Sequence, residues 1–121
     1  MPDVILLMSG TNGFDAESRD RLLRTIVAHF DGWLFVATIP PQCPPRAGFE
    51  QVDAYNASLG GIVTELAAAG KRIAMVDIHA ALTTADLLSD GVHPSAAGML
   101  KMAERWFLAL SELIQQEAGD R

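Results

Sequence analysis

The sequence has few cysteines, no cluster of basic residues and no long apolar run. A single cysteine, Cys43, excludes an intrachain disulfide and any zinc cluster built on cysteines. The net charge is -6 and no Lys/Arg cluster stands out, so no nucleic-acid partner is expected. The longest apolar run near the start, residues 4–8, is far short of the ~20 residues that span a bilayer, so no membrane partner is expected.

The composition predicts one globular domain over residues 1–121. Half of the residues are apolar and 20% are charged, which is typical of a folded chain with a modest core. The start of the sequence lacks the basic leader and cleavage site of a signal peptide. As it stands, the sequence therefore predicts a cytoplasmic chain, and secretion is expected only of a longer parent that carries a leader.

Apolar runs alternate with helical patterns along the chain. Residues 4–8, 32–41 and 72–78 are mainly apolar and do not alternate with polar residues, which indicates strands buried on both faces. Helical spacing follows each run, in the segments from Asp15, around residues 52–66 and from Pro94. This order predicts an α/β fold, a three-layer α/β/α arrangement around a parallel sheet of about three strands.

The helical patterns also predict where individual side chains lie. In the first helix, Arg19 and its charged neighbours are expected to lie mostly off the apolar face. In the last helix, Met99, Met102, Trp106 and Phe107 are interpreted as one core stripe rather than a cofactor site.

The stretch "SDGVHP" places two ionisable residues three positions apart. A histidine general base works best when a carboxylate fixes its tautomer and stabilises its charged form. A turn can bring Asp90 onto His93, so the pair is a candidate for this chemistry. The structural alternative is an Asp-Gly turn followed by Pro94 in the first turn of a helix.

The stretch "SGTNG" follows the first predicted strand. The Asn12 amide could donate a hydrogen bond to a developing oxyanion, and Gly10 beside Thr11 would leave room for a substrate carbonyl. The alternative is a glycine-rich turn that favours asparagine for its backbone tolerance. In parallel α/β sheets, ligands bind beyond the carboxyl ends of strands, where both loops are expected.

Together these segments resemble the SGNH, or GDSL, hydrolase family, and most closely its carbohydrate-esterase branch with the acetylxylan esterases. The resemblance rests on "PDVILLMSGTNG", "FVATIPP", "AYNASLGGIV" and "VDIHAALTTADLLSDGVHPSAAGMLKMAERW". It implies an SGNH (flavodoxin-like) fold, with His93 as general base, Asp90 as third triad member and Asn12 as an oxyanion-hole donor. Gly10 and Thr11 fall in the same family block, whereas Gly13 departs from the aspartate usual at its fourth position.

The Gly-Asp-Ser block that supplies the family's nucleophile is missing from the sequence. So is the block with the oxyanion-hole glycine, and the chain resembles the last three strands of a five-stranded domain. Ser9, Ser89, Ser95 and Cys43 lie near the candidate loops, but none is favoured as a replacement nucleophile.

Two functions follow from this pattern. The first is a hydrolase of carboxylic esters, with a small ester or acetylated carbohydrate as substrate and no metal or cofactor. The second is a non-catalytic α/β module that binds a carbohydrate or acyl ligand, or oligomerises. Without the missing strands, residues 4–8 would form an apolar sheet edge, which predicts a homo-oligomer or domain-exchanged dimer.

Overall fold

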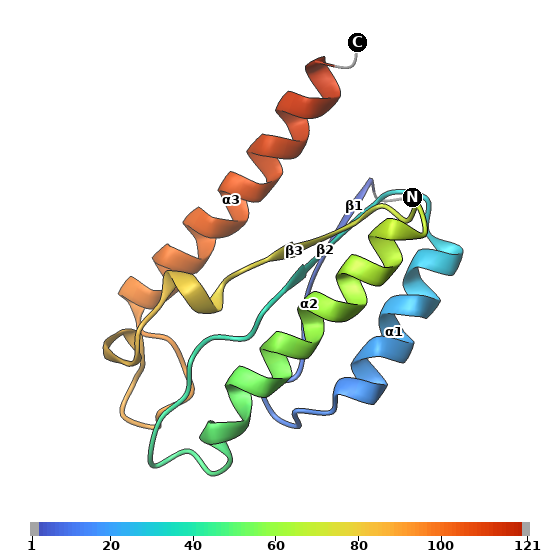
Figure 1. Ribbon diagram of the computed structural model, residues 1–121. Helices are drawn as coiled ribbons and strands as arrows, with labels where there is room; N and C mark the ends of the chain where they lie inside the picture. The colour runs from blue at the N-terminus through green and yellow to red at the C-terminus, as the bar shows by residue number, and fades with distance from the viewer. Residues whose placement is uncertain (1–2, 120–121) are drawn as a thin grey trace.

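A parallel three-stranded sheet forms the centre of the structure, a computed structural model that describes residues 3–119 (Figure 1). The strands are β1 (Val4–Met8), β2 (Trp33–Ala37) and β3 (Ile73–Val76), in the spatial order β1-β2-β3. The register places Leu6 opposite Phe35, which in turn lies opposite Ala74. The predicted strands and their parallel arrangement are confirmed.

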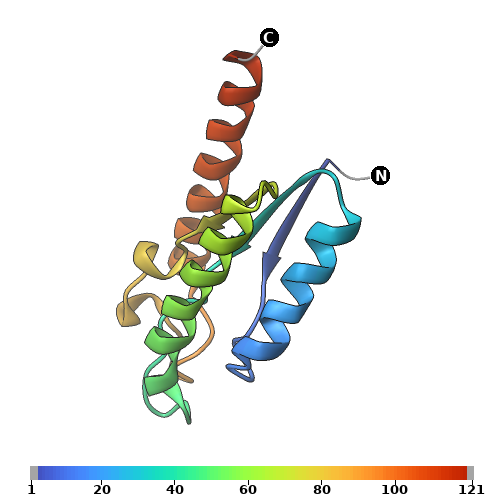
Figure 2. The same ribbon diagram turned by 45° about the vertical axis from the view of Figure 1, so that its right-hand side comes forward.

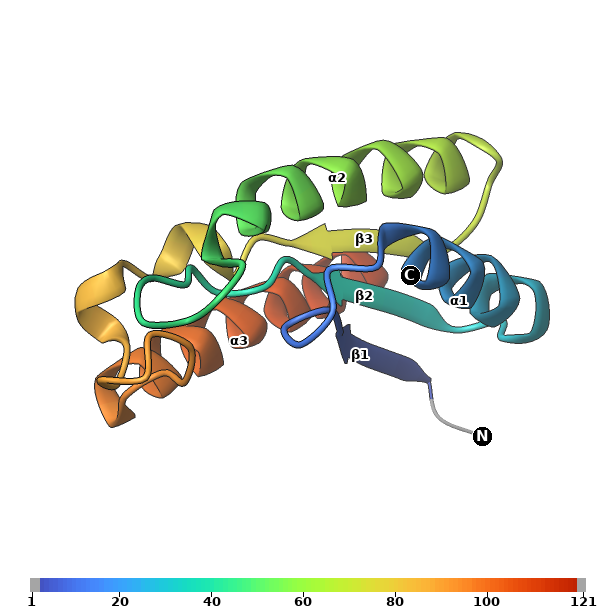
Figure 3. The same cartoon turned by 90° about the horizontal axis from the view of Figure 1, so that it is seen from below.

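Three α-helices cover the sheet on both faces (Figure 3). They are α1 (Ala16–His29), α2 (Val52–Ala68) and α3 (Ala96–Gly119), with short 3-10 turns η1 (Phe49–Gln51), η2 (His79–Ala81) and η3 (Thr84–Asp86). Helices α1 and α2 pack on one face and α3 packs on the other, so the α/β/α layering is confirmed. No helix within residues 3–119 has the length and apolarity that a membrane span requires.

The main core lies between the sheet and the first two helices. Leu34 and Val36 of β2 point to this side and pack with Leu23 of α1 and Leu59 of α2, all essentially inaccessible to solvent. Full burial of one such side chain stabilises the fold by about 1.5–3 kcal/mol. This face therefore holds α1 and α2 in place, and with them the loops that precede each helix.

The second core lies under α3 and includes only part of the predicted stripe. Met102 and Trp106 pack against Phe35 and the rest of this face, as predicted. The prediction is wrong for Met99 and Phe107, because Phe107 is 68% exposed and Met99 also faces solvent. Successive helical residues are rotated by about 100°, so Phe107 lies on the flank of α3 when Trp106 faces the sheet. The carboxyl end of α3 extends beyond the sheet (Figures 1 and 2).

Strand β1 is an open edge of the sheet. It pairs with β2 on one side only, and Leu6 and Met8 are 45% and 39% exposed. Residues 4–8 contain no charge and no proline, the features that usually protect an edge strand. The expected apolar edge is therefore present.

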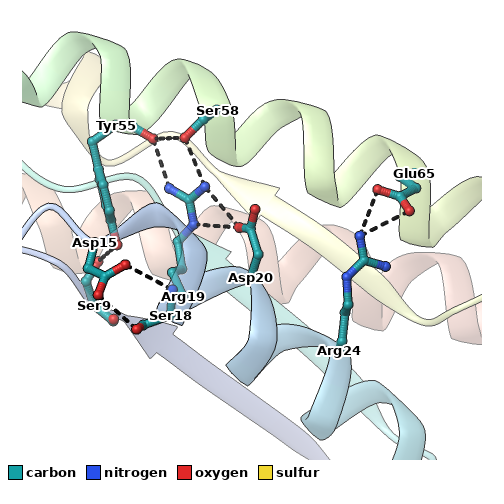
Figure 4. A network of polar contacts seen from close by, with 9 residues as sticks. All are labelled: Ser9, Asp15, Ser18, Arg19, Asp20, Arg24, Tyr55, Ser58 and Glu65. Atoms are coloured by element: carbon teal, nitrogen blue, oxygen red, sulfur yellow. Dashed lines mark hydrogen bonds and ion pairs between the residues drawn. The ribbon is translucent and has the colours of Figure 1, made fainter.

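A buried arginine joins α1 to α2, contrary to the expectation that it would lie off the apolar face. Arg19 is 3% exposed, and its guanidinium donates to the Tyr55 carbonyl at 2.8 Å and to the Ser58 hydroxyl at 2.9 Å (Figure 4). It also bonds the Asp20 carboxylate and lies 4.5 Å from the centre of the Tyr55 ring. The Tyr55 hydroxyl donates to the Ser9 carbonyl at 2.8 Å, so this network reaches the end of β1.

Candidate active site

The Asp90 and His93 side chains contact each other directly, through Oδ2 and Nδ1. The other carboxylate oxygen of Asp90 accepts hydrogen bonds from the backbone N–H groups of Val92 and His93, at 2.9 and 3.0 Å. The His93 backbone N–H is the largest cause, followed by that of Val92 and then the His93 side chain, and together they lower the pKa of Asp90 to about 2. Asp90 is thus an anion at neutral pH.

The protonation of Asp90 determines which histidine nitrogen is available. An ionised carboxylate can only accept, so the neutral His93 ring carries its proton on Nδ1. Nε2 then has a free lone pair and bonds no other residue in the described part of the chain. The His93 side chain is 72% exposed, so Nε2 is accessible to a reacting group from outside.

Backbone hydrogen bonds close the loop that carries the pair. The Leu88 N–H donates to the His93 carbonyl at 2.7 Å, and the Ser95 N–H donates to the Asp86 carbonyl at 2.7 Å. Asp86 is buried and bonds Lys101 of α3 at 2.8 Å. The turn is therefore attached to the first part of α3 by both backbone and side-chain bonds.

The proline-rich segment after β2 packs directly against this turn. The Cys43 N–H donates to the Gly91 carbonyl at 3.0 Å. Gly91 has a φ of +73°, and a Cβ there would lie 2.0 Å from the Cys43 carbonyl oxygen. Glycine is required at this position by both the backbone conformation and the close approach.

The loop after β1 forms a tight turn at Gly10. The N–H groups of Gly13 and Phe14 donate to the Gly10 carbonyl, at 3.2 and 3.0 Å. Gly10 has a φ of +114°, and a Cβ there would lie 2.1 Å from the Tyr55 hydroxyl oxygen. Glycine is therefore required at this position, because the Tyr55 side chain occupies the place where a Cβ would lie.

Asn12 is exposed at the tip of this loop and is bonded by the same proline-rich segment. Arg46 Nη2 donates to Asn12 Oδ1 at 3.0 Å and to the Thr11 carbonyl at 3.2 Å. Gln42 Nε2 donates to the Thr11 carbonyl as well, at 3.2 Å. Residues 42–46 thus touch both candidate loops. No local sequence pattern predicts these contacts, because each joins residues more than 30 positions apart.

Among the described residues, no serine or cysteine side chain is positioned as a nucleophile beside His93. Ser9 accepts through its backbone carbonyl from Tyr55, and the Ser95 hydroxyl accepts from the Gly98 N–H at 3.2 Å in the first turn of α3. Cys43 has a free thiol. No serine or cysteine side chain within residues 3–119 hydrogen-bonds the His93 ring.

Neither a metal cluster nor the main hollow belongs to the candidate site. Within residues 3–119, no three His, Cys, Asp or Glu side chains are close enough to hold a metal ion. A hollow of about 750 Å³ lies at the amino ends of the strands, lined among others by Trp33 and Arg72. It is at the opposite end of the sheet from Asn12, so it is not part of the candidate site.

Comparison with known proteins identifies esterases. No family model matches the chain. It is 25% identical over 130 residues to a "Multidomain esterase" of Ruminococcus flavefaciens, an alignment with 98% of this chain and 17% of that protein.

Solved structures agree with this. A Clostridium thermocellum family 3 carbohydrate esterase is 28% identical, with a TM-score of 0.78 over 97% of this chain and 60% of that one. A member of the lipolytic G-D-S-L family from Veillonella parvula is 22% identical, with a TM-score of 0.69 over 89% of this chain and 63% of that one. The second likeness shows the fold alone.

These comparisons confirm the resemblance to SGNH and GDSL hydrolases, and this chain has their α/β fold. The chain spans about 60% of the length of these solved chains and a much smaller share of the multidomain esterase. It therefore corresponds to part of such a module.

Proposed function

We propose that this chain carries the base and oxyanion half of a carboxylic ester hydrolase site, with O-acetyl groups on carbohydrate as substrate. One observation supports the proposal above the others: Asp90 holds Nδ1 of His93 while Nε2 is accessible and unbonded among the described residues. A histidine that served only the turn would not need a carboxylate on the ring as well as on the backbone. The likeness to a family 3 carbohydrate esterase and to a multidomain esterase supports the proposed class of reaction and a carbohydrate ester as substrate.

The proposed reaction uses each group once per acyl transfer. A serine hydroxyl attacks the acyl carbon as His93 Nε2 takes its proton, and Asp90 stabilises the imidazolium that forms. The carbonyl oxygen becomes an oxyanion that accepts from Asn12 Nδ2. The tetrahedral intermediate collapses, the sugar oxygen leaves with the proton from His93, and water then releases acetate by the same steps. The serine comes from another polypeptide segment or from an unusual position in this chain.

Hydrolysis of p-nitrophenyl acetate tests this proposal. We expect turnover by the unsubstituted chain, loss to the buffer rate in His93→Ala and recovery of part of the rate with added imidazole. His29→Ala is the matched control, because His29 lies exposed on α1 and bonds only the Thr25 carbonyl among the described residues. Ser9→Ala then reports whether Ser9 supplies the nucleophile. Equal rates above the buffer rate in the unsubstituted chain and His93→Ala would contradict the proposal. The buffer rate in both would exclude a serine at an unusual position in this chain.

Substrate class is tested separately with acetylated xylo-oligosaccharide and p-nitrophenyl butyrate. We expect acetate release from the first and slower hydrolysis of the second. A preference for the longer acyl chain would contradict the assignment to acetyl esters.

A second candidate function rests on the open edge of β1. Without a nucleophile against His93, the chain could act as a non-catalytic module that oligomerises or holds an acyl or carbohydrate ligand. Leu6 and Met8 are exposed on a strand with an unpaired side and no charge. A second copy pairing along this strand would satisfy its free backbone groups and cover both side chains.

Light scattering at micromolar concentration tests the proposed homo-oligomer or domain-exchanged dimer. We expect a dimer or larger species that Leu6→Lys converts to a monomer. Leu22→Lys is the matched control, since Leu22 is similarly exposed but lies on α1. A monomeric unsubstituted chain would contradict this assembly.

A further inference from the structure

We propose that Arg46 is a positioning residue that fixes the Asn12 carboxamide with its N–H groups turned toward the substrate. The inference rests on the proposed function and extends it to a residue outside the resemblance motifs. Arg46 comes from the segment after β2, whereas Asn12 follows β1. Their contact therefore fixes the relative positions of two loops that are distant in sequence.

The chemistry of the guanidinium group determines how the amide is oriented. An arginine side chain has donors and no acceptor, so it can bond only the oxygen of a carboxamide. Arg46 Nη2 bonds Asn12 Oδ1 at 3.0 Å. Asn12 Nδ2 must then point away from Arg46, and it bonds no group among residues 3–119. Both of its N–H donors are free for an oxyanion.

The backbone next to Asn12 is held by the same segment. The Thr11 carbonyl accepts from Arg46 Nη2 and from Gln42 Nε2, each at 3.2 Å. Two donors on one carbonyl restrict rotation of the peptide unit that leads into Asn12. The side chain and the backbone of Asn12 are thus fixed together, as a preorganised donor requires.

The segment also contacts the base. The Cys43 N–H bonds the Gly91 carbonyl at 3.0 Å, and the Arg46 N–H bonds the Cys43 carbonyl at 3.0 Å. Asn12 and His93 are therefore connected through a short stretch, residues 42–46, rather than through the whole sheet. This connection sets the distance between oxyanion donor and general base.

The polar groups of the segment indicate a role beyond stability. Gln42 Oε1 and Arg46 Nε are buried without a hydrogen-bond partner among the described residues. Such groups are rare because each lowers stability, and they call for an explanation. Arg46 also forms no salt bridge within residues 3–119, so its charge is not neutralised there and favours a developing oxyanion at Asn12.

NMR of the Asn12 side-chain amide tests the positioning without relying on activity. Its signal is assigned by its loss in Asn12→Asp. We expect a heteronuclear NOE close to that of the rigid backbone in the unsubstituted chain, a clear drop in Arg46→Gln and an intermediate value in Arg46→Lys. Arg21→Gln is the matched control, because Arg21 is exposed on α1. Backbone spectra of β2 and α2 verify that each variant is folded. If Arg46→Gln unfolds, Arg46→Lys replaces it as the test variant.

Kinetics separate this inference from the proposed function. We expect Arg46→Gln to lower kcat for p-nitrophenyl acetate by about tenfold to a hundredfold with KM changed less than about twofold. An unchanged side-chain NOE in Arg46→Gln would overturn the positioning role, whatever the activity. If the unsubstituted chain has no esterase activity, this chain alone is not an esterase, while the NMR result still decides whether Arg46 orients Asn12.

Discussion

Cys43 and Gly91 are in backbone contact, and this contact joins the proline-rich segment to the loop of the candidate base. The Cys43 N–H donates to the Gly91 carbonyl at 3.0 Å. The Cys43 carbonyl oxygen occupies the space where a side chain of residue 91 would begin. The Asp90–His93 turn can therefore approach the rest of the site only because residue 91 has no Cβ.

Gly91→Ala is expected to destabilise the protein by at least about 2 kcal/mol. The φ of +73° is unfavourable for alanine, and the added Cβ would lie 2.0 Å from a backbone oxygen. Urea denaturation measures the change. Gly60→Ala is the control, because Gly60 lies within α2 with nothing near its Cβ position, so alanine should stabilise by roughly 0.5–1 kcal/mol. Equal effects of the two substitutions would contradict the close contact.

The ionised Asp90 should make stability depend on pH in the acid range. Its pKa is lowered from 3.8 to about 2, chiefly by the His93 backbone N–H, so ionised Asp90 favours the folded state. This contribution is complete above the unfolded pKa and is lost as pH falls from about 5 to about 2. Hydrogen bonds also lower the pKa of Asp15 and Asp86, which titrate in the same direction.

Comparison with Asp90→Asn separates the contribution of Asp90 to this pH dependence from those of Asp15 and Asp86. Urea midpoints between pH 5 and pH 2 should fall less steeply in Asp90→Asn than in the unsubstituted chain. Identical slopes would show that Asp90 is not selectively stabilised as an anion by this turn.

Trp106 and Phe107 are neighbours with opposite environments on α3. Trp106 packs on the sheet and Phe107 is 68% exposed. We expect Trp106→Ala to lower the free energy of unfolding by about 2 kcal/mol or more, and Phe107→Ala to change it by less than about 0.5 kcal/mol. Thermal and urea denaturation measure both. A large effect of Phe107→Ala would indicate that its face of α3 is covered in solution.

The fold could be predicted from the sequence because its signals are local. The apolar runs at residues 4–8 and within 72–78 need no distant partner to be recognised, and they contain β1 and β3. The Asp90–His93 contact was also local, since a turn brings residue i onto residue i+3. The exposure of Phe107 was missed because an apolar periodicity does not say how wide a face the sheet covers.

The contacts of Arg46 and Gln42 could not be predicted because they depend on tertiary structure. Both bond the Thr11 carbonyl, more than 30 residues away, and neither belongs to a recognisable pattern. Arg19 is a similar case, because helical spacing alone placed a charged residue toward solvent. Its buried position depends on Tyr55 and Ser58, which lie on α2.

Arg19→Ala is expected to destabilise the protein by about 2–4 kcal/mol. The substitution removes a buried cation and leaves the Tyr55 carbonyl without its bond from Arg19. It also removes the cation from beside the Tyr55 ring, which bonds Ser9 and packs against Gly10.

The control is Arg24→Ala, five residues further along α1. Arg24 Nη2 donates to both carboxylate oxygens of Glu65, at 3.0 Å each. The two side chains are 50% and 59% exposed. Exposed pairs contribute at most about 1 kcal/mol, so Arg24→Ala should have a small effect. Urea denaturation of the two variants, with NMR of the Gly10–Asn12 amides, distinguishes the roles. A comparable loss of unfolding free energy in both variants would mean that Arg19 contributes no more than an ordinary surface ion pair. A larger loss in Arg19→Ala with shifted Gly10–Asn12 signals would mean that the α1–α2 contact supports the oxyanion loop.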